Sequence, residues 1–281
     1  MGSSVVARRF LRHRSGVLGV VALTGLFALA TVAGRVTPAG HRRLTTDYSQ
    51  APSLRHPMGT DAIGHDLFLQ VLHGAQKSLQ VAVVVTVLAT VTGTVLGAAA
   101  GYRGGWVDSV ISRLTDLVLT VPVIVVLVVA AARLRQQRDS WLIIALMISV
   151  VAWPQIARVV RATVLSLRNR SFVTAAQGLG ASSARIIFVD LLPNAVAAIS
   201  VSATLTMATA VLLETALSFL GLGVSAPDPS LGRLVATGQG AARTRPWLFY
   251  FPGIVLVSIC LCFAAIGEGL RSALGPDDDE R

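Results

Sequence analysis

The stretch "SFVTAAQGLGASSARIIFVDLLPN", Ser171–Asn194, separates two long apolar runs of the chain. It contains one carboxylate, Asp190, and no His, Cys, Lys or Glu, so it offers little material for catalysis. Small residues and glycines make up much of the rest. The stretch therefore predicts a short structured loop between two membrane spans, suited to docking or to simple connection and not to chemistry.

The composition on either side of this loop indicates a membrane protein. Of the 281 residues, 53% are hydrophobic and only 14% are charged, whereas soluble domains carry about 25% charged residues. A span needs about 20 apolar residues, and six runs of suitable length are present. The expected spans are approximately 16–34, 78–100, 109–132, 141–160, 194–220 and 247–266.

The first run raises the alternative of a cleaved signal peptide. Four arginines precede it, and the "ALA" at 28–30 resembles a cleavage site. The apolar run is longer than the usual core of a signal peptide, so we expect an uncleaved anchor.

The arginines also predict the orientation of the chain. Basic residues before the first span favour a cytoplasmic N-terminus, and an even number of spans then returns the C-terminus to the same side. The loop at 35–77 would be external, and the loop after the fourth span cytoplasmic. The net charge of +10 comes from basic residues at the ends of apolar segments, which indicates membrane topology and no nucleic-acid partner.

Several kinds of chemistry are missing. Lys77 is the only lysine, and it does not lie in the G-x-x-x-x-G-K-[ST] pattern that binds phosphates. We therefore expect no nucleotide site, no other cofactor and no catalytic residue in this chain. His56 and His65 lie near Asp61 and Asp66 but lack metal-ligand spacing, so we expect no metal. The alternative of a membrane-anchored enzyme has no support, because the sequence offers no set of catalytic residues that would come together at one site.

Two acids inside the apolar runs are candidate functional residues, because ionisable groups in spans are rarely incidental. Asp116 lies one helical turn after Arg113, which predicts a local ion pair. Glu214 has no basic neighbour in its own run, so we expect a hydrogen bond at a subunit interface or a gate. The alternative is that both acids serve an ion-coupled secondary transporter or a channel.

Within the opening stretch, the residues predict two short helices with a bend. Ser171 would cap the first helix, and Gly178 and Gly180 would end it, because glycine tolerates the left-handed conformation at a helix terminus. Ser182 or Ser183 would cap the second. Pro193 would then occupy the first turn of the fifth span, where a missing N–H costs little.

The segment "TAAQGLGASSARIIFVDLLP" resembles the EAA loop of binding-protein-dependent ABC importer permeases, whose pattern is E-A-A-x3-G-x9-I-x-L-P. Thr174 stands in place of the acidic residue, and Asp190 in place of the aliphatic one. The matching positions are Ala175, Ala176, Gly180, Leu192 and Pro193.

A second segment, "HPMGTDAIGHDLFLQVLHGAQKSL", is similar to the H-P-x-G-T-D-x-x-G-R-D segment of the dipeptide, oligopeptide and nickel branch of that family. His65 replaces the usual Arg, and the matching positions are Gly59, Thr60, Asp61, Gly64 and Asp66. We expect this external segment to be a scaffold or a receptor contact in preference to a substrate site. The ending "GEGLRSALGP" also resembles the branch.

The resemblance implies an all-α membrane protein with six transmembrane helices, the type I ABC importer permease fold, and both termini in the cytoplasm. It implies an N-terminal part at 1–77, a five-helix core at 78–266 containing the loop at 171–193, and a tail at 267–281. The short loop after the first span points to the second permease subunit of the branch.

The resemblance also implies the partners and the activity. They are a homologous permease, two cytoplasmic ATPases or one fused ATPase that bind ATP and Mg, an external solute-binding protein or lipoprotein, and lipid of the bacterial cytoplasmic membrane. Residues 172–181 would form the coupling helix. Dipeptides are the first expectation for the substrate and oligopeptides the second; nickel complexes and other solutes stay open.

Overall fold

The computed structural model describes residues 3–36, 40, 43–134, 141–224 and 229–274. Across these residues the protein is helical, and the β-structure consists of two isolated bridges, Leu44 with His65 and Thr60 with Asp66. The helices are α1 Ser3–Arg12, α2 Arg14–Val36, α3 Leu67–Arg103, α4 Gly105–Thr120, α5 Val123–Arg133, α6 Trp141–Leu167, α7 Ser171–Gly178, α8 Ser183–Arg185, a π-helical turn Ile186–Leu191, α9 Leu192–Phe219, α10 Leu231–Gln239 and α11 Trp247–Leu274.

The six apolar runs predicted as spans correspond to helices. Five helices in the described part of the chain are long and apolar enough to cross a membrane, and a sixth span results if the bent pair α4 and α5 is counted as one. The all-α, six-span expectation is therefore confirmed, with one difference: the third span is bent by 82°. Pro122 causes the break, because it pushes Val121 into an extended conformation (φ −80°, ψ 134°) that cannot continue the helix.

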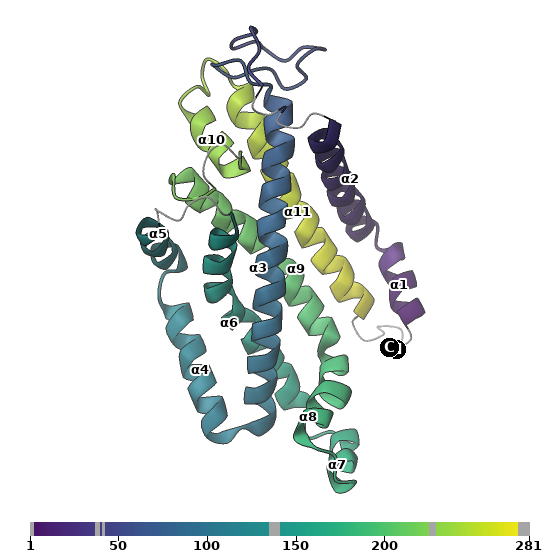
Figure 1. Cartoon of the computed structure of the whole chain (residues 1–281). Helices are drawn as coiled ribbons and strands as arrows, with labels where there is room; N and C mark the ends of the chain where they lie inside the picture. Colours follow the sequence, from purple (N-terminus) through teal and green to yellow (C-terminus); the bar gives the residue numbers. More distant parts are fainter. Residues whose placement is uncertain (1–2, 37–39, 41–42, 135–140, 225–228, 275–281) are drawn as a thin grey trace.

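Helix α3 is longer than the expected span at 78–100, because Asp66 caps it and starts it at Leu67. At 37 residues and 1.5 Å per residue it is about 55 Å long. In Figure 1 it runs through the molecule between two ends. We call the end with the segment 43–66 and α10 the cap end, and the end with α7 and α8 the loop end.

The packing of α3 on α6 depends on three glycines at helical spacing. A Cβ atom at Gly97 would lie 2.5 Å from the carbonyl oxygen of Ala157, and one at Gly101 would lie 2.8 Å from that of Arg161. A Cβ atom at Gly93 would lie 2.8 Å from the carbonyl oxygen of Trp153. Small residues of this kind let two membrane helices approach with their backbones nearly in contact. We call this line of contact the glycine seam.

The first and the last described helices both point away from the cap end (Figure 1). Helix α1 contacts α11, and both α1 and the last turns of α11 point away from the cap end in Figure 1. This arrangement agrees with an even number of spans. Which of the two ends is cytoplasmic remains an expectation from the arginines.

Candidate functional site

Helix α7 forms the predicted first helix of the opening stretch, but its start differs from the expectation. Ser171 does not cap it. Arg170 occupies the cap position with extended backbone (φ −74°, ψ 151°) and without a capping side-chain bond, so Ser171 is the first helical residue. Ser171 follows the cap position by one residue, because the turn after α6 ends at Arg170. The N–H of Arg170 bonds to the carbonyl of Leu167 at 3.0 Å and closes that turn.

Gly180 ends α7 as predicted, in the left-handed conformation with φ +77°. The N–H of Ala181 bonds to the carbonyl of Ala176 at 3.0 Å, and that of Gly180 bonds to Gln177 at 2.9 Å. This pair of bonds is a Schellman closure, which requires a residue that tolerates positive φ. Gly180 therefore sets the direction in which the chain leaves α7.

The second predicted helix runs without interruption into the fifth span. Ser182 caps α8, with its hydroxyl accepting the N–H of Arg185 at 3.3 Å. The helix then passes through one π-helical turn, in which the N–H of Leu192 reaches the carbonyl of Ile187. Pro193 lies in the first turn of α9. Because Pro193 has no N–H, the α-helical bonding pattern is broken there, and the wider turn accommodates the loss.

Three buried apolar residues fasten this loop to the loop end of the bundle. Val173, Ile186 and Leu191 are at most 1% exposed and belong to one cluster with residues of α3 and α6. The Gln177 side chain donates to the hydroxyl of Tyr102 on α3 at 3.5 Å. Buried side chains of this loop therefore share one apolar cluster with residues of both helices of the glycine seam.

The remaining surface of α7 faces outward. Thr174 and Ala175 are exposed and Ala176 is half-buried. The Thr174 hydroxyl bonds to its own helix, at the carbonyl of Arg170 (3.3 Å). Leu179 is 89% exposed, and the sequence reasoning missed it, although an apolar residue between two glycines was a usable signal.

The GTD segment, Gly59–Asp66, folds tightly against the start of α11. Thr60 is fully buried; its hydroxyl donates to the carbonyl of Asp47 at 2.6 Å and accepts the N–H of Gln50 at 2.8 Å. The indole N–H of Trp247 donates to the carbonyl of Thr60 at 3.3 Å.

Both glycines of the GTD segment have left-handed backbone. Gly59 has φ +79° and Gly64 has φ +89°, and Cβ atoms there would lie 2.6 Å and 2.3 Å from the carbonyl oxygens of Gln50 and Thr45. Only glycine fits such positions without strain.

Asp61 and Asp66 each hold several backbone N–H groups. The Asp61 carboxylate accepts the N–H groups of Ile63 (3.0 Å) and His65 (2.8 Å). The Asp66 carboxylate caps α3 by accepting the N–H groups of Phe68 and Leu69. The structure thus places all five matched residues of the GTD segment in one interlocked turn.

His56 lies between Asp47 and Asp66 and contacts both carboxylates. Its ring nitrogens lie 2.7 Å from Asp66 and 3.2 Å from Asp47. The hydrogen bond to the Asp66 carboxylate, opposed by burial and assisted by Asp47, raises the pKa of His56 above its ordinary value. No group of three or more potential metal ligands is found among the described residues.

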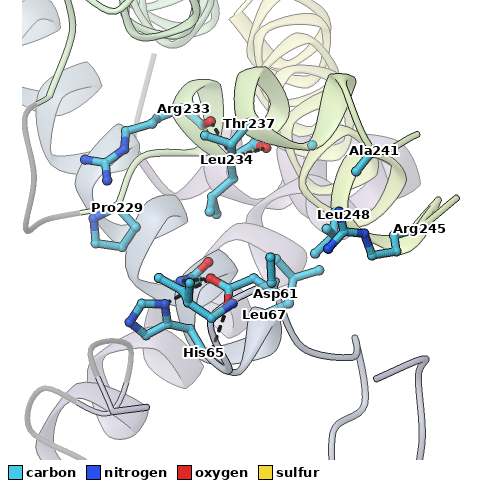
Figure 2. Close-up of a pocket in the computed structure, with 14 residues that line it drawn as sticks. Asp61, His65, Leu67, Pro229, Arg233, Leu234, Thr237, Ala241, Arg245 and Leu248 are labelled. Atoms are coloured by element: carbon cyan, nitrogen blue, oxygen red, sulfur yellow. Dashed lines mark hydrogen bonds and ion pairs between the residues drawn. The ribbon is translucent and has the colours of Figure 1, made fainter. Parts of the chain in front are cut away.

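A pocket of about 580 Å³ opens beside the GTD segment, between the start of α3, α10 and the start of α11. Figure 2 shows Asp61 and His65 on one wall, and Arg233 and Arg245 on the far sides of the opening. We call it the cap pocket. Its lining residues are Asp61, Ala62, Ile63, His65, Leu67, Gln70, Pro229, Arg233, Leu234, Thr237, Gly238, Ala241, Arg245 and Leu248.

The expected local pair of Asp116 with Arg113 is wrong. The Asp116 carboxylate accepts a hydrogen bond from Arg158 of α6 at 2.8 Å. A second pair, Asp108 with Arg161, which the sequence reasoning missed, links the same two helices through two hydrogen bonds, one of them at 2.7 Å. Helix α4 is thus held to α6 by charge, because its own buried contacts are few.

Glu214 is fully buried and its partners are hydroxyl groups. It accepts from Ser78 of α3 at 2.8 Å and from Ser218 one turn further along α9 at 2.7 Å. Glu214 therefore joins α3 and α9, at a helix junction within this chain.

Comparison with known proteins identifies the family. The family model described as "Binding-protein-dependent transport system inner membrane component" matches residues 93–274. The oligopeptide transport system permease protein OppC of Mycobacterium tuberculosis is 39% identical over 276 residues, which are 97% of this chain and 94% of OppC. The dipeptide transport system permease protein DppC of Alkalihalophilus pseudofirmus is 36% identical, covering 96% and 88% of the two chains.

A solved structure supports the same fold. The MetNI methionine ABC transporter, in inward-facing conformations, matches with a TM-score of 0.63 and 19% identity, covering 75% of this chain and 98% of the other. Its fold is that of a type I ABC importer permease. The chain therefore belongs to the family of binding-protein-dependent transport system inner membrane components, as a multi-pass permease of the bacterial inner membrane.

Proposed function

We propose that this chain is the permease subunit of an ATP-driven importer that moves peptides into the cell by alternating access, driven by separate ATPase subunits through α7. The observation that carries the proposal is the two-sided construction of α7. One side carries Val173, which is buried in one apolar cluster with residues of α3 and α6, while the other presents Ala175 and Leu179 to solvent.

This construction suits a mechanical joint. A groove on an ATPase that contacts the exposed side of α7 would carry the helix with it when the ATPases close on ATP. The buried side would pass that movement to α3 and α6. Such coupling needs contacts that differ between the two states of the transporter, because a contact of equal strength in both states shifts nothing.

The polar start of the EAA loop is altered in this chain, and the exposed side chains suggest what replaces it. Thr174 stands where the pattern has an acid, and its hydroxyl is used within α7. An ion pair at that position is therefore not available. Docking would instead depend on apolar contact, with Leu179 as the apolar side chain of the loop that has the highest exposed fraction.

The partners follow from the same proposal. They are a second, homologous permease, two ATPases or one fused ATPase that bind ATP and Mg, and an external solute-binding protein or lipoprotein. The loop end, with α7, would face the cytoplasm, and the cap end would face outward. Both chain termini would then be cytoplasmic.

Peptides are the proposed substrate class because relatives over nearly the whole chain are named for oligopeptide and dipeptide transport. Dipeptides and oligopeptides remain separate possibilities. Uptake of labelled dipeptides and oligopeptides by a strain lacking this gene, and by the same strain complemented with it, distinguishes them.

The coupling role is tested by two substitutions in α7 and its closure. Gly180→Val forces a β-branched residue into positive φ, and Ala175→Trp places a large ring on the exposed side. Both should reduce peptide uptake and substrate-stimulated ATP hydrolysis, while the chain still inserts and assembles. Ala51→Trp, at an exposed position of the cap, is the matched control. Wild-type transport by both variants would refute the role of α7.

The alternative of an ion-coupled transporter gains no support from the acids. Asp116 is paired with Arg158, and Glu214 is sealed by hydroxyl groups. Co-purification of the chain with ATPase subunits separates the two mechanisms. Peptide uptake that follows an ion gradient without ATPases would favour the alternative.

A further inference from the structure

The Asp61 carboxylate, on the wall of the cap pocket that comes from the GTD segment, is already fully used within the protein. The Asp61 carboxylate accepts two backbone N–H groups, bonds to the ring of His65 at 2.9 Å, and accepts from the Gln70 amide at 3.3 Å. A carboxylate has room for about four such bonds. Asp61 is therefore used for holding the wall together.

Two other sides of the opening carry further hydrogen-bond donors. Arg233 is half-buried, and its backbone N–H bonds to Ser230, the cap of α10, at 3.3 Å. Within the described parts of the chain, its guanidinium has no hydrogen bond or ion pair. Arg245 uses one N–H on the Ser49 hydroxyl at 2.9 Å. A guanidinium has five N–H donors, so several remain available at the opening shown in Figure 2.

The floor of the pocket is apolar. Leu67, Leu234 and Leu248 line it and are between 1% and 9% exposed. Guanidinium groups bind carboxylates with paired, charge-assisted hydrogen bonds, and the leucines favour an apolar group. The chemistry that fits is a carboxylate attached next to an apolar side chain.

A free peptide is a poorer fit than a carboxylate within a protein. A peptide carries an ammonium group as well, and Asp61, the acid among the described lining residues, is already occupied. Leaving a charge unpaired in a partly closed pocket is costly. A side chain on a folded partner brings neutral peptide groups around its carboxylate and avoids this cost.

We propose that the cap pocket receives an acidic side chain and an adjacent apolar residue from the surface of the solute-binding protein. This inference rests on the proposed function, in which the cap end faces outward. Arg233 would bind the carboxylate, and the leucine floor would hold the apolar neighbour. The site is one of docking, separate from the path of the substrate.

The experiment measures binding of the fluorophore-labelled solute-binding protein to the complete importer in nanodiscs. Arg233→Gln should raise Kd roughly tenfold, as expected for the loss of a charge-assisted bond, and Arg233→Lys should restore only part of the affinity. Thr237→Trp, which fills the pocket, should weaken binding similarly. Gln239→Trp, on the same helix but outside the lining, is the matched control.

Two results would overturn the inference. The first is unchanged Kd in both Arg233→Gln and Thr237→Trp. The second is saturable binding of labelled Leu-Leu to the importer without the solute-binding protein, lost in Arg233→Gln, which would make the pocket a substrate site. Neither result affects ATPase assembly or coupling through α7, so the proposed function would stand or fall separately.

Discussion

Replacing Gly97 by alanine tests the closest backbone contact of the glycine seam. The new Cβ atom would lie 2.5 Å from the carbonyl oxygen of Ala157, where ordinary contact begins at 3.4 Å. Helices α3 and α6 must therefore separate by about 0.9 Å, the difference between these distances. Overpacking of this kind costs about 1–3 kcal/mol, and alanine returns up to about 1 kcal/mol through its higher helix propensity.

The expected net loss is about 1–2 kcal/mol, seen as a melting temperature several degrees lower in detergent, followed by fluorescence-detected size exclusion. Gly25→Ala is the matched control, because Gly25 lies in helix α2 and a Cβ atom there meets nothing within 4 Å. It should be neutral or slightly stabilising. If Gly97→Ala melts at or above the temperature of Gly25→Ala, the glycine seam does not hold α3 against α6 as described.

Three further predictions concern polar contacts. Glu214→Leu leaves the buried hydroxyl of Ser78 without its acceptor and should lower the free energy of unfolding by about 1–3 kcal/mol. Glu214→Gln keeps one acceptor oxygen and should lower it less. Equal melting temperatures for the two variants would contradict this prediction. The pKa of His56 is raised in the fold, so protonated His56 stabilises the protein fully below the ordinary pKa of 6.5, and this stabilisation is lost as pH rises through the higher folded pKa. His56→Gln should therefore flatten the dependence of the melting temperature on pH above about 6.5. An unchanged profile would exclude His56 as the source of that dependence. Single and double replacements of Asp108 and Arg161 by Asn and Gln should show a coupling energy of about 0.5–3 kcal/mol, whereas additive effects would mean that the pair does not hold α4 to α6.

Local residue patterns predicted much of the fold and of the loop. Apolar runs gave the spans, because a membrane helix must satisfy its backbone internally and so appears as one long apolar segment. Gly180 predicted the end of α7, since positive φ selects glycine. The bend in the third span also has a local cause, Pro122. It was not predicted, because the apolar run continues without interruption on both sides of this proline.

Contacts between distant residues could not be predicted in the same way. Asp116 pairs with a residue 42 positions away, although Arg113 is a plausible neighbour along its own helix. Glu214 has one of its partners, Ser78, on another helix, 136 positions away. The cap pocket forms only when the GTD segment and α10 meet. Each depends on how helices pack, which a periodic pattern does not specify.

The position of the glycine seam along α3 has a mechanical consequence. From Gly97, the helix extends about 45 Å towards Leu67 and about 9 Å towards Arg103, at 1.5 Å per residue. If α3 turned about the middle of the seam as a stiff rod, the two arms of this lever would have a ratio of about five. A displacement of about 1 Å at the α7 end, close to the Tyr102 contact, would swing the pocket end by about 5 Å. Small strokes at one face of the membrane would thus become large ones at the other.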